Sequence, residues 1–76
     1  MNTQKIIIEL IDRNNGKWTW YQLERGLNQL GLGGQVNSSE ELNKLVAEGF
    51  LEARVDERYP APLYFVTELG RRFISR

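Results

Sequence analysis

The sequence predicts a small α+β domain in which three helices carry a β-hairpin and a short C-terminal helix. Three stretches place apolar residues at three- and four-residue steps, which is the spacing of amphipathic helices. Two short segments, 50–55 and 63–66, are rich in β-type residues and flank a polar turn that contains two prolines, which indicates a hairpin. The 76 residues form one domain over 1–76, because so short a chain cannot bury a second core.

The first expected helix covers residues 1–15, with Thr3 as its N-cap. Its inward stripe consists of three aliphatic residues: Ile7, Leu10 and Ile11. Ile6 and Ile8 flank this stripe and make the apolar arc wider than a surface helix needs. Either these two residues pack beneath the hairpin and the last helix, or they form a second contact surface, most simply a homodimer seam.

The second expected helix begins with a capping box formed by Thr19 and Gln22. Four apolar residues share the face that we expect in the core: Trp20, Leu23, Leu27 and Leu30. Tyr21 and Arg25 lie on the opposite face, where they could contact a phosphate. Both residues also suit an ordinary exposed helix face.

The third expected helix covers about 38–48 and follows a glycine-rich turn at 31–36. Its start allows two frames, because Ser38 with Glu41 makes a capping box and Asn37 with Glu40 is an equally good one. Leu42, Leu45 and Val46 form its apolar face. Gly49 is expected to end the helix in a left-handed conformation.

Alternation in the first strand places Leu51, Ala53 and Val55 on one side and Glu52 and Arg54 on the other. The turn at 56–62 is too polar and too proline-rich to be strand. After the second strand, Thr67 is expected to cap a last short helix, whose inward pair is Leu69 and Phe73.

The segments LxxLVAEGFLEAR and YFVTELGRRF resemble the winged-helix repressors of the MarR and PadR kind. In those families the recognition helix ends in L-x-x-x-G before two apolar residues, and the wing is followed by a Y-x-V-T-x-x-G segment. The first motif is matched at Leu45, Gly49, Phe50 and Leu51. The second motif is matched at Tyr64, Val66, Thr67 and Gly70. The resemblance covers about three quarters of the chain and implies a winged-helix fold.

The resemblance carries two further implications. Trp18 is expected to act as a single strand-like residue that pairs with the wing. If Tyr64 and Val66 face the core, then Leu63 and Phe65 face outward and form an apolar patch, which usually marks a partner surface. The alternative is that the last turn, at 69–74, covers this pair.

Composition excludes several kinds of chemistry. The chain has neither cysteine nor histidine, so we expect no disulfide, no metal site, no cofactor and no enzymatic activity. No apolar run is long enough to span a membrane and no secretory signal is present, so we expect a cytoplasmic protein without a membrane partner. The net charge is zero, and it divides into +1 over 1–36, −3 over 37–53 and +2 over 54–76.

Two functions remain open. The first is a DNA-binding transcriptional regulator, with a homodimer as one possible form, which inserts the recognition helix (about 38–48) into the major groove of double-stranded DNA and places the wing (about 51–66) against the backbone. The residues expected to contact DNA are Ser38, Ser39, Asn43, Lys44, Arg54, Arg58, Tyr59, Tyr21 and Arg25.

The alternative is a winged-helix module that binds a protein partner and no DNA. It would use the acidic third helix and an apolar interface formed by Ile6, Ile8, Leu63 and Phe65. The acidic charge of that helix favours this alternative, because DNA binders normally present a basic face.

Overall fold

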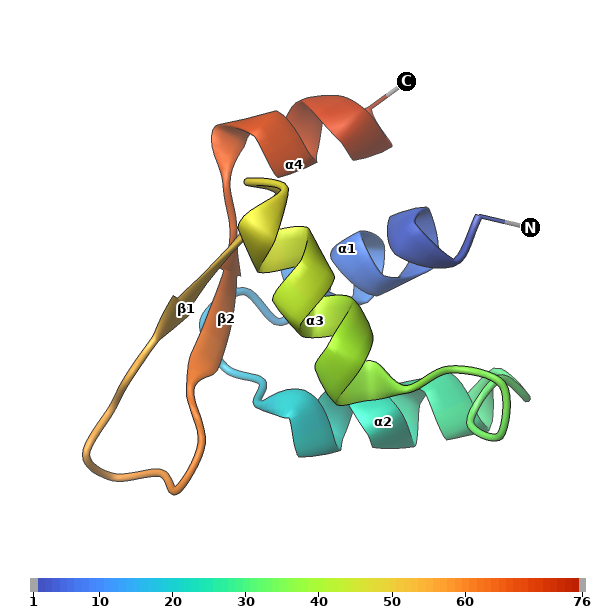
Figure 1. Ribbon diagram of the computed structural model, residues 1–76, viewed down its shortest axis with the longest axis horizontal. Coiled ribbons are helices and arrows are strands. Elements are labelled where there is room, and N and C mark those ends of the chain that lie inside the picture. The colour runs from blue at the N-terminus through green and yellow to red at the C-terminus, as the bar shows by residue number, and fades with distance from the viewer. Residues whose placement is uncertain (1, 76) are drawn as a thin grey trace.

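The computed structural model describes residues 2–75, which form four helices and one antiparallel hairpin. The elements are α1 (Thr3–Arg13), α2 (Trp20–Gln29), α3 (Ser38–Ala47), β1 (Leu51–Arg54), β2 (Leu63–Val66) and α4 (Glu68–Ile74). In Figure 1 the hairpin stands at one edge of the molecule, with α2 and α4 at opposite ends and α3 between them. This small α+β arrangement is compatible with a winged helix.

Side-chain caps fix where the first three helices begin. Asn2 accepts a hydrogen bond from the Lys5 backbone at 3.1 Å, so Asn2 caps α1 and Thr3 lies inside the helix. The prediction that Thr3 is the cap was therefore wrong. The capping box of Thr19 and Gln22 is confirmed at the start of α2. At α3, Asn37 accepts from the Glu40 backbone at 3.1 Å, which selects the second of the two expected frames.

The core lies where α1, α2, α3 and β2 meet. Seven aliphatic side chains there are fully buried: Ile7, Ile8, Ile11, Leu23, Leu27, Leu42 and Leu45. Leu10, expected in the inward stripe of α1, packs at the border of this core and is only partly buried. On α2, Trp20 and Leu30 were expected in the core. Both predictions were wrong, because Trp20 is 38% exposed and Leu30 is also exposed. These two residues lie at and just beyond the ends of α2, outside the contact made by Leu23 and Leu27 in its middle.

The hairpin is joined to the segment between α1 and α2. Tyr64 donates its backbone N–H to the Trp18 carbonyl at 3.1 Å, and the Gly16 backbone donates to the Tyr64 carbonyl at 2.9 Å. The Asn15 side chain accepts from the Val66 backbone at 2.8 Å. The expected pairing of Trp18 with the wing is therefore confirmed, and at Tyr64 both backbone groups are paired.

The outer half of the hairpin extends beyond the core. Leu51 is buried opposite Val66, but Ala53 is exposed and Val55 is 87% exposed. Of the three residues placed on one side of this strand, only Leu51 is therefore buried. The hairpin is longer than the core beneath it, because the core covers only the part of the hairpin nearest α3.

The two faces of β2 are both covered, contrary to the expectation that Leu63 and Phe65 face solvent. Leu63 is only 7% exposed, and Phe65 is partly buried. The Gly16 backbone lies so close to the Phe65 ring that an added Cβ would stand 2.3 Å from it. The Arg54 guanidinium covers the same ring at 4.2 Å from its centroid. A turn and a side chain from β1 therefore close this face.

The last helix packs on Phe50, the residue just before β1. Thr67 caps α4 as predicted, since its hydroxyl accepts from the Gly70 backbone at 3.1 Å. Phe73 packs on Phe50 with ring centroids 5.0 Å apart. Leu69, expected to form an inward pair with Phe73, is instead 49% exposed. Gly70 faces inward instead, and its lack of a side chain lets the backbone of α4 approach the backbone of Phe50.

Candidate nucleic-acid interface

The exposed face of α3 is polar and carries three of the residues expected to contact DNA. Ser39, Asn43 and Lys44 are all exposed. Glu40 is exposed beside them, so the face is mixed in charge.

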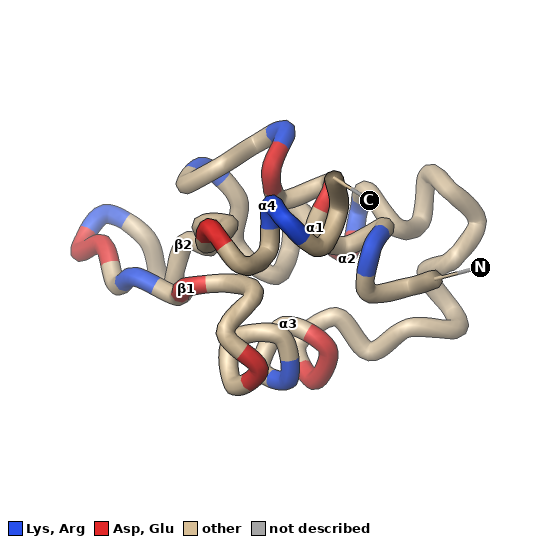
Figure 2. The backbone as a smooth tube through the Cα atoms, turned by 90° about the horizontal axis from the view of Figure 1, so that it is seen from above, with Lys and Arg blue, Asp and Glu red and all other residues tan. Residues whose placement is uncertain are grey.

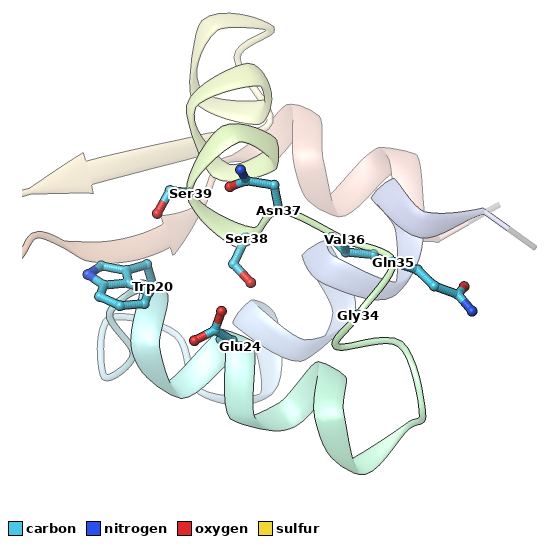
Figure 3. Close-up of a pocket in the computed structure, with 8 residues that line it drawn as sticks. All are labelled: Trp20, Glu24, Gly34, Gln35, Val36, Asn37, Ser38 and Ser39. Carbon is cyan, nitrogen blue, oxygen red and sulfur yellow. The ribbon is translucent and has the colours of Figure 1, made fainter.

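Ser38 was expected to contact DNA, and the structure places it inside the protein. It is only 4% exposed, and its hydroxyl has no hydrogen-bond partner among the described residues. Ser38 stands four and seven residues before Leu42 and Leu45, so it belongs to the buried face of the helix. Figure 3 shows its side chain directed from the start of α3 toward Glu24 on α2. This prediction was wrong, and the helical spacing alone could have corrected it.

Arg54 is held by its own strand. Its guanidinium makes two hydrogen bonds to the Glu52 carboxylate, at 2.8 and 3.3 Å, and stacks on Phe65. These hydrogen bonds, and then the opposite charge of the partner, lower the pKa of Glu52 and raise the pKa of Arg54. Glu52 and Arg54 are two residues apart on β1, so they emerge on the same face of the strand. Arg54 must therefore exchange a carboxylate for a phosphate to bind DNA.

Arg58 at the wing tip is held in the same way by Asp56. The guanidinium donates to the Asp56 carboxylate at 2.8 and 3.1 Å, and the Arg58 backbone N–H donates to it at 3.0 Å. These bonds to the Arg58 side chain and backbone lower the pKa of Asp56 to about 2. They also shape the turn, because the carboxylate closes a ring with the backbone two residues later.

The Asp56 contact predicts a titration at unusually low pH. Because the pKa of the folded form is depressed, the contact is fully present above the ordinary value of 3.8 and is lost as the pH falls through about 2. We expect the carboxyl signal of Asp56 in an NMR titration to have its midpoint near 2. Arg58→Gln should move that midpoint toward 3.8. A midpoint near 3.8 in the unmodified chain would contradict the contact.

The helix α3 and the wing together are acidic. Between residues 38 and 66, six acidic side chains stand against three basic ones, a net charge of −3. Figure 2 shows the two signs alternating along the wing and mixed on α3. An isolated basic face, which most duplex binders present, is not found on these elements.

The start of α2 and the wing tip meet at a hollow of about 360 Å³. It is lined by Thr19, Trp20, Tyr21, Gln22, Tyr59, Pro60 and Ala61. Trp20, Tyr21 and Tyr59 are all exposed, and the Trp20 and Tyr21 rings meet edge to face at 5.8 Å. The structure thus brings together Tyr21 and Tyr59, two of the expected DNA contacts.

The positions of Trp20 and Arg25 differ from what the sequence predicted. Sequence reasoning placed Trp20 in the core, because it continues the spacing of Leu23 and Leu27, and no signal in the chain contradicted that reading. Arg25 is exposed but lines a different hollow, with Trp18, Gln22, Gly26 and Gln29.

The expected apolar interface does not exist as an exposed surface. Ile8 is fully buried and Leu63 nearly so, while Ile6 packs against the core and Phe65 is covered as described above. The cause is that α1 packs against α2, α4 and β2, and its wide apolar arc provides the contact surface for all three. Because Ile8 is fully buried, it cannot form part of a homodimer interface.

Within residues 2–75, no group of three or more acidic side chains is placed to hold a metal ion. No helix in this part of the chain has the length and apolar character needed to cross a membrane. Comparisons with models of protein families, with curated proteins and with solved structures gave no match.

Proposed function

We propose that this chain is a winged-helix domain that binds double-stranded DNA as a transcriptional regulator. The observation that carries the proposal is the relation of α3 to the wing. One side of α3 is fully packed by Leu42 and Leu45, its other side is polar and exposed, and the hairpin follows it directly along the chain (Figure 1). A recognition helix with an adjoining wing uses two neighbouring elements of this kind.

The residues then have distinct roles. Asn43 and Ser39 on the exposed face of α3 supply hydrogen-bonding groups for base edges. Lys44, Arg54 and Arg58 supply positive charge for phosphates, which fixes the register of the protein on the duplex. Arg54 and Arg58 already have carboxylate partners. Each must leave its carboxylate to contact a phosphate, so the net electrostatic gain is small.

The proposal predicts duplex binding with a shallow dependence on salt. With four cations at most, Lys44, Arg54, Arg58 and Arg25, the slope of log K against log salt should lie between about −2 and −4. Fluorescence anisotropy of a labelled duplex pool across a salt series measures this slope. Arg58→Gln should flatten it by about 1.

The matched control for that variant is Arg72→Gln. Arg72 is also exposed and also paired at 2.7 Å, with Glu68, but it lies on α4 at the far end of the molecule from the wing tip (Figure 1). This substitution should leave the slope unchanged. Absence of duplex binding even at low salt would overturn the proposal.

A second candidate is a domain that docks a protein partner. The net charge of −3 between residues 38 and 66 favours it, because that charge opposes phosphate. So does the hollow at the wing tip, since exposed aromatic side chains are typical of protein interfaces. The two candidates separate in the salt series, because a regulator should bind the labelled duplex with the slope given above, whereas a domain that only docks a protein partner should not bind the duplex even at low salt.

A further inference from the structure

The hollow at the wing tip, described above, has the lining of a site for proline. Its lining includes the rings of Trp20, Tyr21, Tyr59 and Pro60, and none of these rings belongs to the core. Flat aromatic walls of this kind receive the rings of a proline-rich segment, which is already extended before it binds. Such a segment loses little conformational entropy on docking.

Trp20 also lines a second hollow, of about 400 Å³, on the side of α3. This hollow is polar and lies between α2 and the start of α3, with Glu24 at one wall and Ser38 and Ser39 at the other (Figure 3). The Ser38 hydroxyl is buried, has no hydrogen-bond partner within residues 2–75, and points toward the Glu24 side. A buried hydroxyl without a partner is uncommon, and a donor placed beside it would satisfy it.

The charge around the second hollow is negative. The start of α3 contributes a partial positive charge of about half a unit. Glu24 at the wall and Glu40 and Glu41 in the first turn of α3 contribute three carboxylates. The carboxylates outweigh the helix end, so this hollow complements a basic side chain.

We propose that these two hollows form one groove that binds an extended, proline-containing peptide with a basic side chain. The prolines lie against Trp20, Tyr21 and Tyr59, and the arginine or lysine reaches past Trp20 to Glu24 and the Ser38 hydroxyl. The partner is therefore a basic, proline-rich segment of another protein. This inference goes beyond DNA binding and does not depend on it.

The probe is a short polyproline peptide with one arginine, acetylated and amidated at its ends, together with citrulline and glutamate versions of the same peptide. Calorimetry gives the affinities. The arginine peptide should bind about tenfold more tightly than the citrulline peptide, a difference of about 1.4 kcal/mol, because citrulline keeps the shape and loses the charge. The glutamate peptide should bind more weakly still.

The two tryptophans locate the site. In a nitrogen-15 NMR titration, the indole N–H signal of Trp20 should shift with the arginine peptide. The signal of Trp18, which lines a different hollow, should stay in place. A titration in which Trp20 does not move, or moves only with duplex DNA or with rising protein concentration, overturns the proposal.

Variants test each half of the groove. Tyr21→Ala and Tyr59→Ala, both at exposed side chains, should each weaken binding about tenfold. Val55→Ala, at an exposed wing residue outside the groove, is the control and should change nothing. Glu24→Gln should reduce the preference for arginine over citrulline while the prolines still bind. An unchanged preference would contradict the role of Glu24. Duplex binding of the same variants is measured separately, so loss of either function is seen on its own.

Discussion

Replacing Gly70 with alanine is expected to destabilise the protein by about 3 kcal/mol. A Cβ at this position would stand 2.3 Å from the carbonyl oxygen of Phe50 and 2.9 Å from a methyl group of Val66. The carbonyl cannot retreat easily, because it accepts hydrogen bonds from the backbone and the hydroxyl of Thr67, both at 3.1 Å. The added methyl group must therefore push α4 away from the start of β1.

Thermal unfolding followed by circular dichroism measures this effect, and the midpoint should fall by roughly 15 °C. Gly34→Ala is the matched control. Its Cβ would meet nothing within 4 Å and its φ is not positive, so the midpoint should stay within a few degrees. An unchanged midpoint in Gly70→Ala would show that α4 does not pack on Phe50 as described.

The sequence predicted the elements of the fold well where local signals determine them. The capping box of Thr19 and Gln22, the Thr67 cap and the left-handed Gly49 are all set by residues within a few positions of one another. The wing pairing of Trp18 came from the family resemblance and is also confirmed. Apart from the Thr3 cap, the predictions that failed concern burial. Trp20 and Leu69 have suitable spacing but lie where no neighbouring element covers them.

The candidate site was predictable only in part, for two physical reasons. The burial of Phe65 depends on the Gly16 turn, which is distant in sequence and carries no signal for what it covers. The pairing of the wing arginines is local, and a signal was present, because Glu52 and Arg54 share a strand face and Asp56 and Arg58 are two apart. Reading the arginines as free cations overlooked this signal.

Releasing the wing arginines should strengthen duplex binding if the proposed function is right. Glu52→Gln together with Asp56→Asn removes both carboxylate partners and changes the charge of residues 38–66 from −3 to −1. We expect affinity at low salt to rise at least tenfold and the salt slope to move toward the steep end of the range, about −4, because Arg54 and Arg58 no longer have to leave a carboxylate to contact phosphate. Asparagine at 56 keeps an oxygen that can accept the Arg58 backbone N–H, so the turn should survive.

The comparison that decides the role of the wing is between single variants of equal charge. Glu52→Gln frees Arg54 on the wing, and Glu68→Gln frees Arg72 on α4, so each removes one exposed carboxylate partner from an arginine. Neither should change stability by more than about 0.5 kcal/mol, because exposed ion pairs contribute little. A gain in affinity for Glu52→Gln alone would place the wing against the backbone. Equal gains would mean that only net charge matters and that the wing makes no phosphate contact. No binding by any of these variants would leave the acidic α3 and the aromatic groove as a surface for protein partners.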